Sequence, residues 1–99
     1  ILTLVTQFEE TIRADLAALQ AAIKAGNATL SGEIAHRALG VCLVMGAVTL
    51  TGRLRRIEEA AVAADTEIAR GLATGLDPIL RSTLIEMRSA LEPPASSGF

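Results

Sequence analysis

The chain contains a single histidine, His36, and a single cysteine, Cys42, and these are its candidate nucleophiles. A free imidazole has a pKa near ~6.5, so at neutral pH a ring nitrogen is available to attack phosphorus without a separate base. If the surrounding residues form a helix, the step of ~100° per residue points His36 roughly 200° away from Ile34. His36 then faces outward, whereas Cys42 lies on the inner side and is expected to be a small core residue.

The residues expected around His36 on the outer face are small or apolar. Gly32 and Gly40 lie one turn before and one turn after it, and Leu39 and Leu43 lie nearby. Glycine inside a helix costs about 1 kcal/mol relative to alanine, but it lets a large partner approach closely. Exposed leucines indicate an apolar docking surface. These features predict a site that another protein visits, and an exposed histidine on a helix rich in alanine and glycine is the alternative.

Other chemistries that a histidine supports lack partners in this sequence. A metal site needs more ligands than His36 and the neighbouring Glu33, and Cys42 lies about 240° around the helix. No nucleophile for a hydrolytic triad is evident, although tertiary partners stay open. The chain has no Walker loop, no dinucleotide-binding fingerprint and no kinase lysine–aspartate set. We therefore expect no ATP site, no cofactor and no metal ion in this domain.

The sequence around His36 resembles that of histidine-containing phosphotransfer (HPt) domains. These domains carry a His-x-x-Lys-Gly pattern and a Gly-Ala pair ten and eleven residues after the histidine. That spacing is matched by His36, Gly40, Gly46 and Ala47. The flanking matches are Ala35, Gly26-Asn27, and Leu54, Ile57, Glu58 and Ala60, which fit the family's Leu-x-x-Leu-Glu-x-Ala stretch. The resemblance covers most of residues 5–64.

The resemblance implies that His36 accepts a phosphoryl group from the aspartyl phosphate of a receiver domain and passes it to a second receiver. The ring nitrogen remote from the backbone would carry the group. The chain would then be a phosphorelay intermediate of a two-component system, and a carrier without a kinase site. The Mg²⁺ that such transfers need would belong to the partner receiver. The expected docking surface consists of Gly32, Glu33, Arg37, Leu39, Gly40 and Leu43.

One position departs from the family pattern, because Leu39 stands where the family has lysine. A cation there could help to hold a phosphoryl group, and a leucine cannot. Arg37 projects about 100° away from His36, so it would replace the lysine only if its side chain curled back. Transfer that is slower, or a phosphohistidine that is less stable, is the expected consequence. A degenerate adaptor that binds a receiver without transferring phosphate is the alternative function.

Composition excludes several classes of partner. The 99 residues suffice for one domain, and the formal charge of −2 argues against a nucleic-acid surface. No apolar run reaches 18 residues, so we expect no direct contact with a membrane. The chain begins at Ile1, and we expect it to be the C-terminal module of a cytoplasmic or membrane-anchored hybrid sensor histidine kinase. As an isolated domain it is expected to be a monomer.

Apolar residues at steps of three and four predict four helices. The first spans residues 3–25, and the second spans 28–45, with an inner arc formed by Leu30, Ile34, Ala38, Val41, Cys42 and Met45. A third is expected from 47 to about 73, with a break near Asp65 as the alternative. The last begins at an Asp77 cap with Pro78 in its first turn and ends before Pro93. The predicted fold is an antiparallel up-down-up-down four-helix bundle over residues 1–92 with a disordered tail over 93–99.

Overall fold

The computed structural model describes residues 2–91, and this part of the chain is helical with no strands. Its five helices are α1 (Leu2–Lys24), α2 (Ala28–Met45), α3 (Val48–Val62), α4 (Thr66–Ala73) and α5 (Leu76–Leu91). The predicted all-helical class is confirmed. The tail predicted over residues 93–99 lies outside the described residues. None of the described helices combines the length and apolar character needed to cross a membrane.

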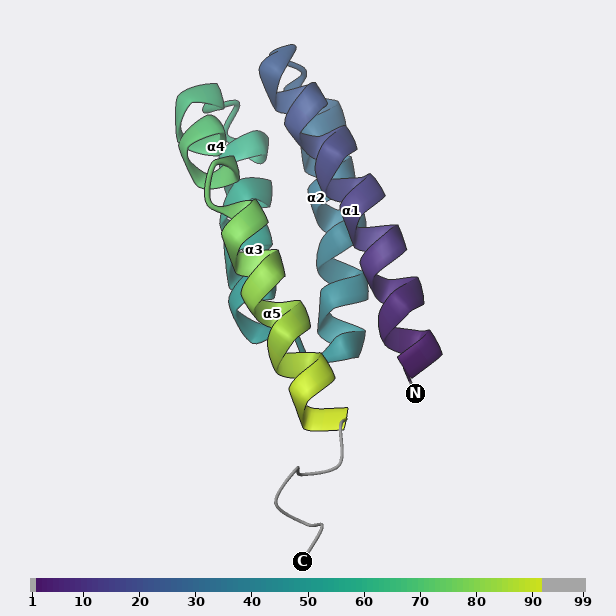
Figure 1. Cartoon of the computed structure of the whole chain (residues 1–99). Coiled ribbons are helices and arrows are strands. Elements are labelled where there is room, and N and C mark those ends of the chain that lie inside the picture. Colours follow the sequence, from purple (N-terminus) through teal and green to yellow (C-terminus); the bar gives the residue numbers. More distant parts are fainter. Residues whose placement is uncertain (1, 92–99) are drawn as a thin grey trace, which may run out of the picture.

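The long helices lie alongside one another, and the short α4 lies beside them at one end of the molecule (Figure 1). Helix α1 packs against α2, α4 and α5, and α3 packs against the same three helices. Figure 1 shows α4 at the end of the molecule where α1 turns into α2. The histidine helix α2 therefore has α1 on one flank and α3 on the other.

Aliphatic side chains from every long helix fill the core. Burying one such side chain stabilises the fold by about 1.5–3 kcal/mol. The largest fully buried side chains are Ile12, Leu19, Cys42, Leu50, Leu54, Ile57, Leu76 and Leu80. Their three- and four-residue spacing places them on one stripe of each helix, as the sequence pattern predicts.

Local signals at both ends of α2 confirm its predicted bounds. The Asn27 side chain accepts a hydrogen bond of 3.0 Å from the Leu30 amide, which satisfies one of the free N–H groups of the first turn. Gly46 ends the helix at φ +71°, a left-handed conformation that suits glycine. The start and the end of α2 can thus be predicted from adjacent residues.

The buried face of α2 differs from the predicted arc. The residues buried on this helix are Ser31, Ile34, Ala35, Ala38, Leu39 and Cys42. This stripe is rotated by roughly 60° from the expected one at the helical step of ~100° per residue. Leu30 is consequently exposed and Leu39 enters the core. The rotation arises because α2 must face both α1 and α3, and His36 still lies outside the buried arc.

The prediction of one long third helix to Ala73 is wrong, and the alternative break near Asp65 is correct. Helix α3 ends at Val62, and Ala64 adopts a left-handed φ of +56°. The Asp65 side chain then accepts a hydrogen bond of 3.1 Å from the Ile68 amide and caps α4. The chain reverses here, so α4 folds back onto α3.

The last helix also starts earlier than predicted. It begins at Leu76, so Asp77 lies in its first turn and is not its cap. Leu76 is fully buried, which ties the first turn to the core. An acidic residue in the first turn is still favourable next to the helix dipole.

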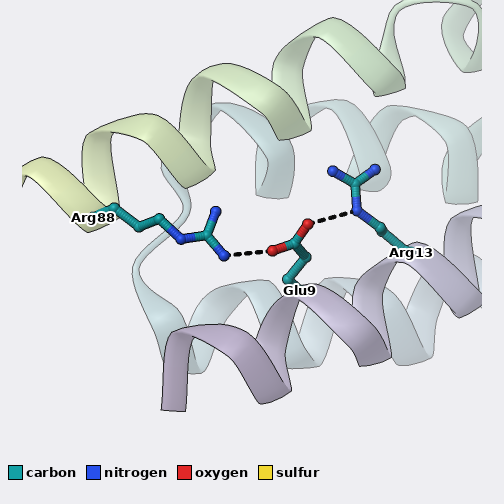
Figure 2. A network of polar contacts seen from close by, with 3 residues as sticks. All are labelled: Glu9, Arg13 and Arg88. Atoms are coloured by element: carbon teal, nitrogen blue, oxygen red, sulfur yellow. Dashed lines mark hydrogen bonds and ion pairs between the residues drawn. The ribbon is translucent and has the colours of Figure 1, made fainter. Parts of the chain in front are cut away.

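An ion network links α1 to α5 (Figure 2). The two carboxylate oxygens of Glu9 accept hydrogen bonds from Arg88 of α5 and from Arg13 of α1, the latter at 2.8 Å. The hydrogen bond from Arg88 lowers the pKa of Glu9, and the hydrogen bond from Arg13 lowers it further. The network therefore favours the ionised carboxylate.

Candidate functional site

His36 protrudes from α2 next to a carboxylate of α3. Its Nδ1 lies 2.8 Å from Oε2 of Glu58. The His36 side chain is 74% exposed, whereas the Glu58 side chain is 27% exposed. One edge of the imidazole is thus fixed by the protein while the rest of the ring faces solvent.

This contact determines which nitrogen is available for chemistry. A carboxylate only accepts hydrogen bonds, so Nδ1 carries the hydrogen that it donates to Glu58. In the neutral ring the lone pair then lies on Nε2, the nitrogen remote from the backbone. The geometry leaves Nε2 as the nucleophilic atom and directs it away from Glu58.

Two contacts define the register between α2 and α3. His36 meets Glu58, and a Cβ built at Gly32 would lie 3.5 Å from the Cβ of Ala61. Residue numbers therefore rise along α2 as they fall along α3, so the two helices are antiparallel. Gly32 occupies the helix–helix contact, where the small side chain opposite it lets the backbones approach.

Gly40 has a different environment from Gly32. Within the part of the chain that the structure describes, a Cβ built at Gly40 would meet nothing within 4 Å. The packing of this chain gives no reason for a glycine at that position, although an alanine would favour the helix. Gly40 leaves open space one turn beyond His36, as the sequence analysis predicted.

An open groove of about 620 Å³ runs beside His36 between α2 and α3. The exposed Glu33 borders it on α2, and Val62 borders it on α3. The complete lining is Ala28, Thr29, Gly32, Glu33, His36, Glu58, Ala61, Val62 and Ala64. The groove is mostly apolar and has two carboxylates near the imidazole.

Two of the predicted docking residues lie elsewhere than expected. Leu39 is only 7% exposed and belongs to the core, so its expected place on the docking surface is wrong. The rotated buried face of α2 is the cause. Arg37 is exposed, but its guanidinium donates hydrogen bonds of 2.9 and 3.2 Å to Oδ1 of Asp15 on α1. It does not curl back toward His36.

Gly32, a third predicted docking residue, is half-buried in the contact between α2 and α3, whereas the other three are accessible. Leu43 is 55% exposed, and Glu33 and Gly40 are exposed as well. Glu58 was not among the predicted site residues. Its contact with His36 depends on the packing of two helices, and its place in the family-like stretch is the one sequence signal that marks it.

Cys42 has no accessible surface and contributes no chemistry to the site. Burial raises the pKa of its thiol to about 12, and the negative charge of Asp15 adds to this rise. A thiol that stays protonated inside the core is unreactive. The interpretation of Cys42 as a core residue agrees with this position.

Comparison with protein-family models, curated proteins and solved structures gave no match. The function proposed below therefore depends on the geometry around His36 and on the resemblance of its motif to that of HPt domains.

Proposed function

We propose that the chain is a phosphorelay intermediate of the HPt type. His36 accepts a phosphoryl group from the aspartate of a receiver domain and passes it to the aspartate of a response regulator. The observation that carries this proposal is an exposed imidazole whose Nδ1 is held by Glu58, so that Nε2 is free to react. The HPt-like spacing of His36, Gly40, Gly46 and Ala47 supports the same function.

The proposed transfer is a displacement at phosphorus. The Nε2 lone pair forms the bond to phosphorus while the bond from phosphorus to the aspartyl oxygen breaks, and the carboxylate leaves with that electron pair. The ring then has a hydrogen on Nδ1 and a phosphoryl group on Nε2, so it is positively charged. Glu58 stabilises this charge from 2.8 Å. Attack by a second receiver's aspartate on the phosphorus regenerates the neutral imidazole.

The proposed architecture is an antiparallel four-helix bundle of the up-down-up-down type. In this arrangement α1, α2 and α3 supply three helices, and α4 followed by α5 supplies the fourth, broken at residues 74–75. The packing of α1 and α3 against both α2 and α5 supports it. A bundle suits the function because it holds His36 on a rigid helix rather than on a loop.

The receiver is expected to dock over the outer face of α2. Gly40 leaves room for its loops, Leu43 offers apolar contact, and the groove beside His36 can receive side chains of the partner. The Mg²⁺ that offsets charge on the transferring group would be held by the receiver. The domain would act as a monomer in the cytoplasm, as a module of a hybrid sensor kinase.

One observation favours a second function. Leu39 is buried at the position where HPt domains have a lysine, so this position offers no cation to the phosphoryl group. A chain that has lost this cation could bind a receiver without accepting phosphate. The alternative is therefore a degenerate HPt-like adaptor.

Phosphotransfer from a panel of labelled, phosphorylated receivers distinguishes the two functions. The native chain and His36→Gln are compared, and the label is tested for stability in acid and in base. Label that appears only on the native chain, and is acid-labile but base-stable, supports the phosphorelay intermediate. Binding without label supports the adaptor. If no receiver in the panel binds the chain and none labels it, both functions are contradicted.

A further inference from the structure

Two acidic side chains border the site, and phosphorylation of His36 would add further negative charge beside them. Glu58 lies against His36, and Glu33 borders the same groove. A phosphoryl group adds a charge of about −1.5 to −2. Two acidic side chains next to it would oppose this charge unless a cation lies within reach.

Neither α2 nor Arg53 of α3 supplies that cation. Position 39 is a buried leucine, and Arg37 is paired with Asp15 on the opposite flank of α2. On α3, the guanidinium of Arg53 donates a hydrogen bond of 3.3 Å to the carbonyl oxygen of Leu72 in α4. These side chains point toward other helices.

The antiparallel register places Arg55 close to the site. Arg55 precedes Glu58 by three residues, which is ~4.5 Å along the helix axis and about 60° farther toward the outside of α3. On α2 the same direction leads from His36 to Gly40, one turn away. A Cβ built at Gly40 would meet nothing within 4 Å among the described residues, so the surface one turn beyond His36 is open to solvent.

The Arg55 side chain is also free to move. It is exposed, and among residues 2–91 it forms no salt bridge or side-chain hydrogen bond. A guanidinium offers a fork of donors that matches the oxygens of a phosphoryl group. Arg55 therefore combines the charge, the donor geometry and the freedom that such a contact needs.

We propose that Arg55 binds the phosphoryl group of phosphorylated His36, reaching over from α3. This contact replaces the cation that is missing at position 39, and it rests on the proposed function of His36. The side chain is solvated before transfer and turns toward the phosphoryl oxygens once the nitrogen–phosphorus bond has formed. Its positive charge attracts the phosphoryl group and so offsets the repulsion from Glu33 and Glu58.

Chemical phosphorylation tests this contact without a receiver. With phosphoramidate, Nε2 bonds to phosphorus, the phosphorus–nitrogen bond of the reagent breaks, and ammonia leaves. The modified site is unambiguous because the chain has one histidine. Nuclear magnetic resonance of the arginine Nε–H groups is recorded before and after the reaction. The Arg55 signal should shift on phosphorylation, and the Arg56 signal should not.

The lifetime of the phosphohistidine gives a second readout. Arg56 is a matched control because it lies next to Arg55 in α3 but borders the groove toward α4 with Ile68. Arg55→Gln should shorten the lifetime about two- to fivefold, the range expected for an exposed ion pair. Arg55→Lys should have a smaller effect, and Arg56→Gln should have none.

The results separate failure of this contact from failure of the proposed function. If phosphohistidine forms but the Arg55 signal does not shift and Arg55→Gln has the native lifetime, the contact is wrong. If His36 does not react with phosphoramidate, the assignment of Nε2 as a free, reactive nitrogen is wrong, and the contact that depends on it is wrong as well. The proposed function is judged separately by transfer from receivers, which does not depend on Arg55.

Discussion

Glu58 and His36 lie 22 positions apart in the chain, yet Oε2 of the first is 2.8 Å from Nδ1 of the second. The contact joins α3 to α2 and fixes the ring so that Nε2 faces solvent. A hydrogen bond of this kind would serve the proposed phosphotransfer in two ways. It selects the reactive tautomer before the transfer, and it stabilises the positive ring during it.

Replacing Glu58 should therefore slow phosphorylation of His36 without unfolding the domain. We expect Glu58→Ala to reduce the rate of transfer from a phosphorylated receiver about tenfold, the lower end of the range for losing an orienting partner. Glu58→Gln should lose less, because its amide oxygen still accepts from Nδ1. The exposed Glu59 provides the control, since Glu59→Gln should transfer at the native rate. Ring-nitrogen resonances should show a mixed tautomer in Glu58→Ala, and an unchanged tautomer would contradict the assigned role.

Gly40 offers a test in which stability and activity move in opposite directions. Because a Cβ at Gly40 meets nothing, Gly40→Ala should stabilise the free domain by about 0.5–1 kcal/mol. Denaturant unfolding measures this gain. If the open space admits a receiver, the same variant should transfer more slowly, and Gly40→Leu should be slower still.

The control for Gly40 is Gly52, an exposed position in α3 that also has nothing within 4 Å of a built Cβ. Gly52→Ala should give a similar gain in stability at the native rate of transfer. Equal transfer rates for Gly40→Ala and Gly52→Ala would show that the receiver does not use the space at Gly40.

Introducing at position 39 the lysine that HPt domains have should destabilise the chain. Leu39 is 7% exposed and contacts the core, so Leu39→Lys exchanges a buried aliphatic side chain for an ammonium group. We expect the free energy of unfolding to fall by about 2–4 kcal/mol. Leu43→Lys, at an exposed position of the same helix, should change it by less than about 0.5 kcal/mol. Native stability of Leu39→Lys would mean that position 39 faces solvent.

The sequence predicts some features well because their signals are local. The bounds of α2 follow from Asn27 and Gly46, whose capping roles depend only on adjacent residues. The break before α4 was harder to predict, because the apolar residues of α3 recur at steps of three and four, and this spacing continues without interruption to Ile68. The Asp65 cap and the left-handed Ala64 end α3 and start a new helix despite that spacing.

The site shows where sequence reasoning ends. The outward direction of His36 follows from helical periodicity, but the burial of Leu39 depends on a rotation of α2 that its two neighbouring helices impose. The partner of His36 could not be found from spacing, because residues in different helices meet only through their tertiary register. The same limit applies to Arg37, whose partner Asp15 lies on α1.

The ion network at Glu9 makes part of the stability depend on pH. Arg88 and Arg13 lower the pKa of Glu9 below its usual value of 4.5. A carboxylate whose pKa is lower in the folded state stabilises the fold above its unfolded pKa. That contribution is lost as the pH falls from about 4.5 through the folded pKa, because the protonated group no longer attracts the guanidinium groups.

Glu9→Gln should accordingly be less stable than the native chain near pH 7, and the difference should shrink as the pH falls below 4.5. Thermal unfolding of both chains between pH 7 and pH 3 measures this convergence. Glu10→Gln serves as the control, because Glu10 is exposed and forms no salt bridge among the described residues. It should differ little from the native chain over the same range. A Glu9→Gln difference that stays constant down to pH 3 would show that the network contributes through packing and not through the charge of Glu9.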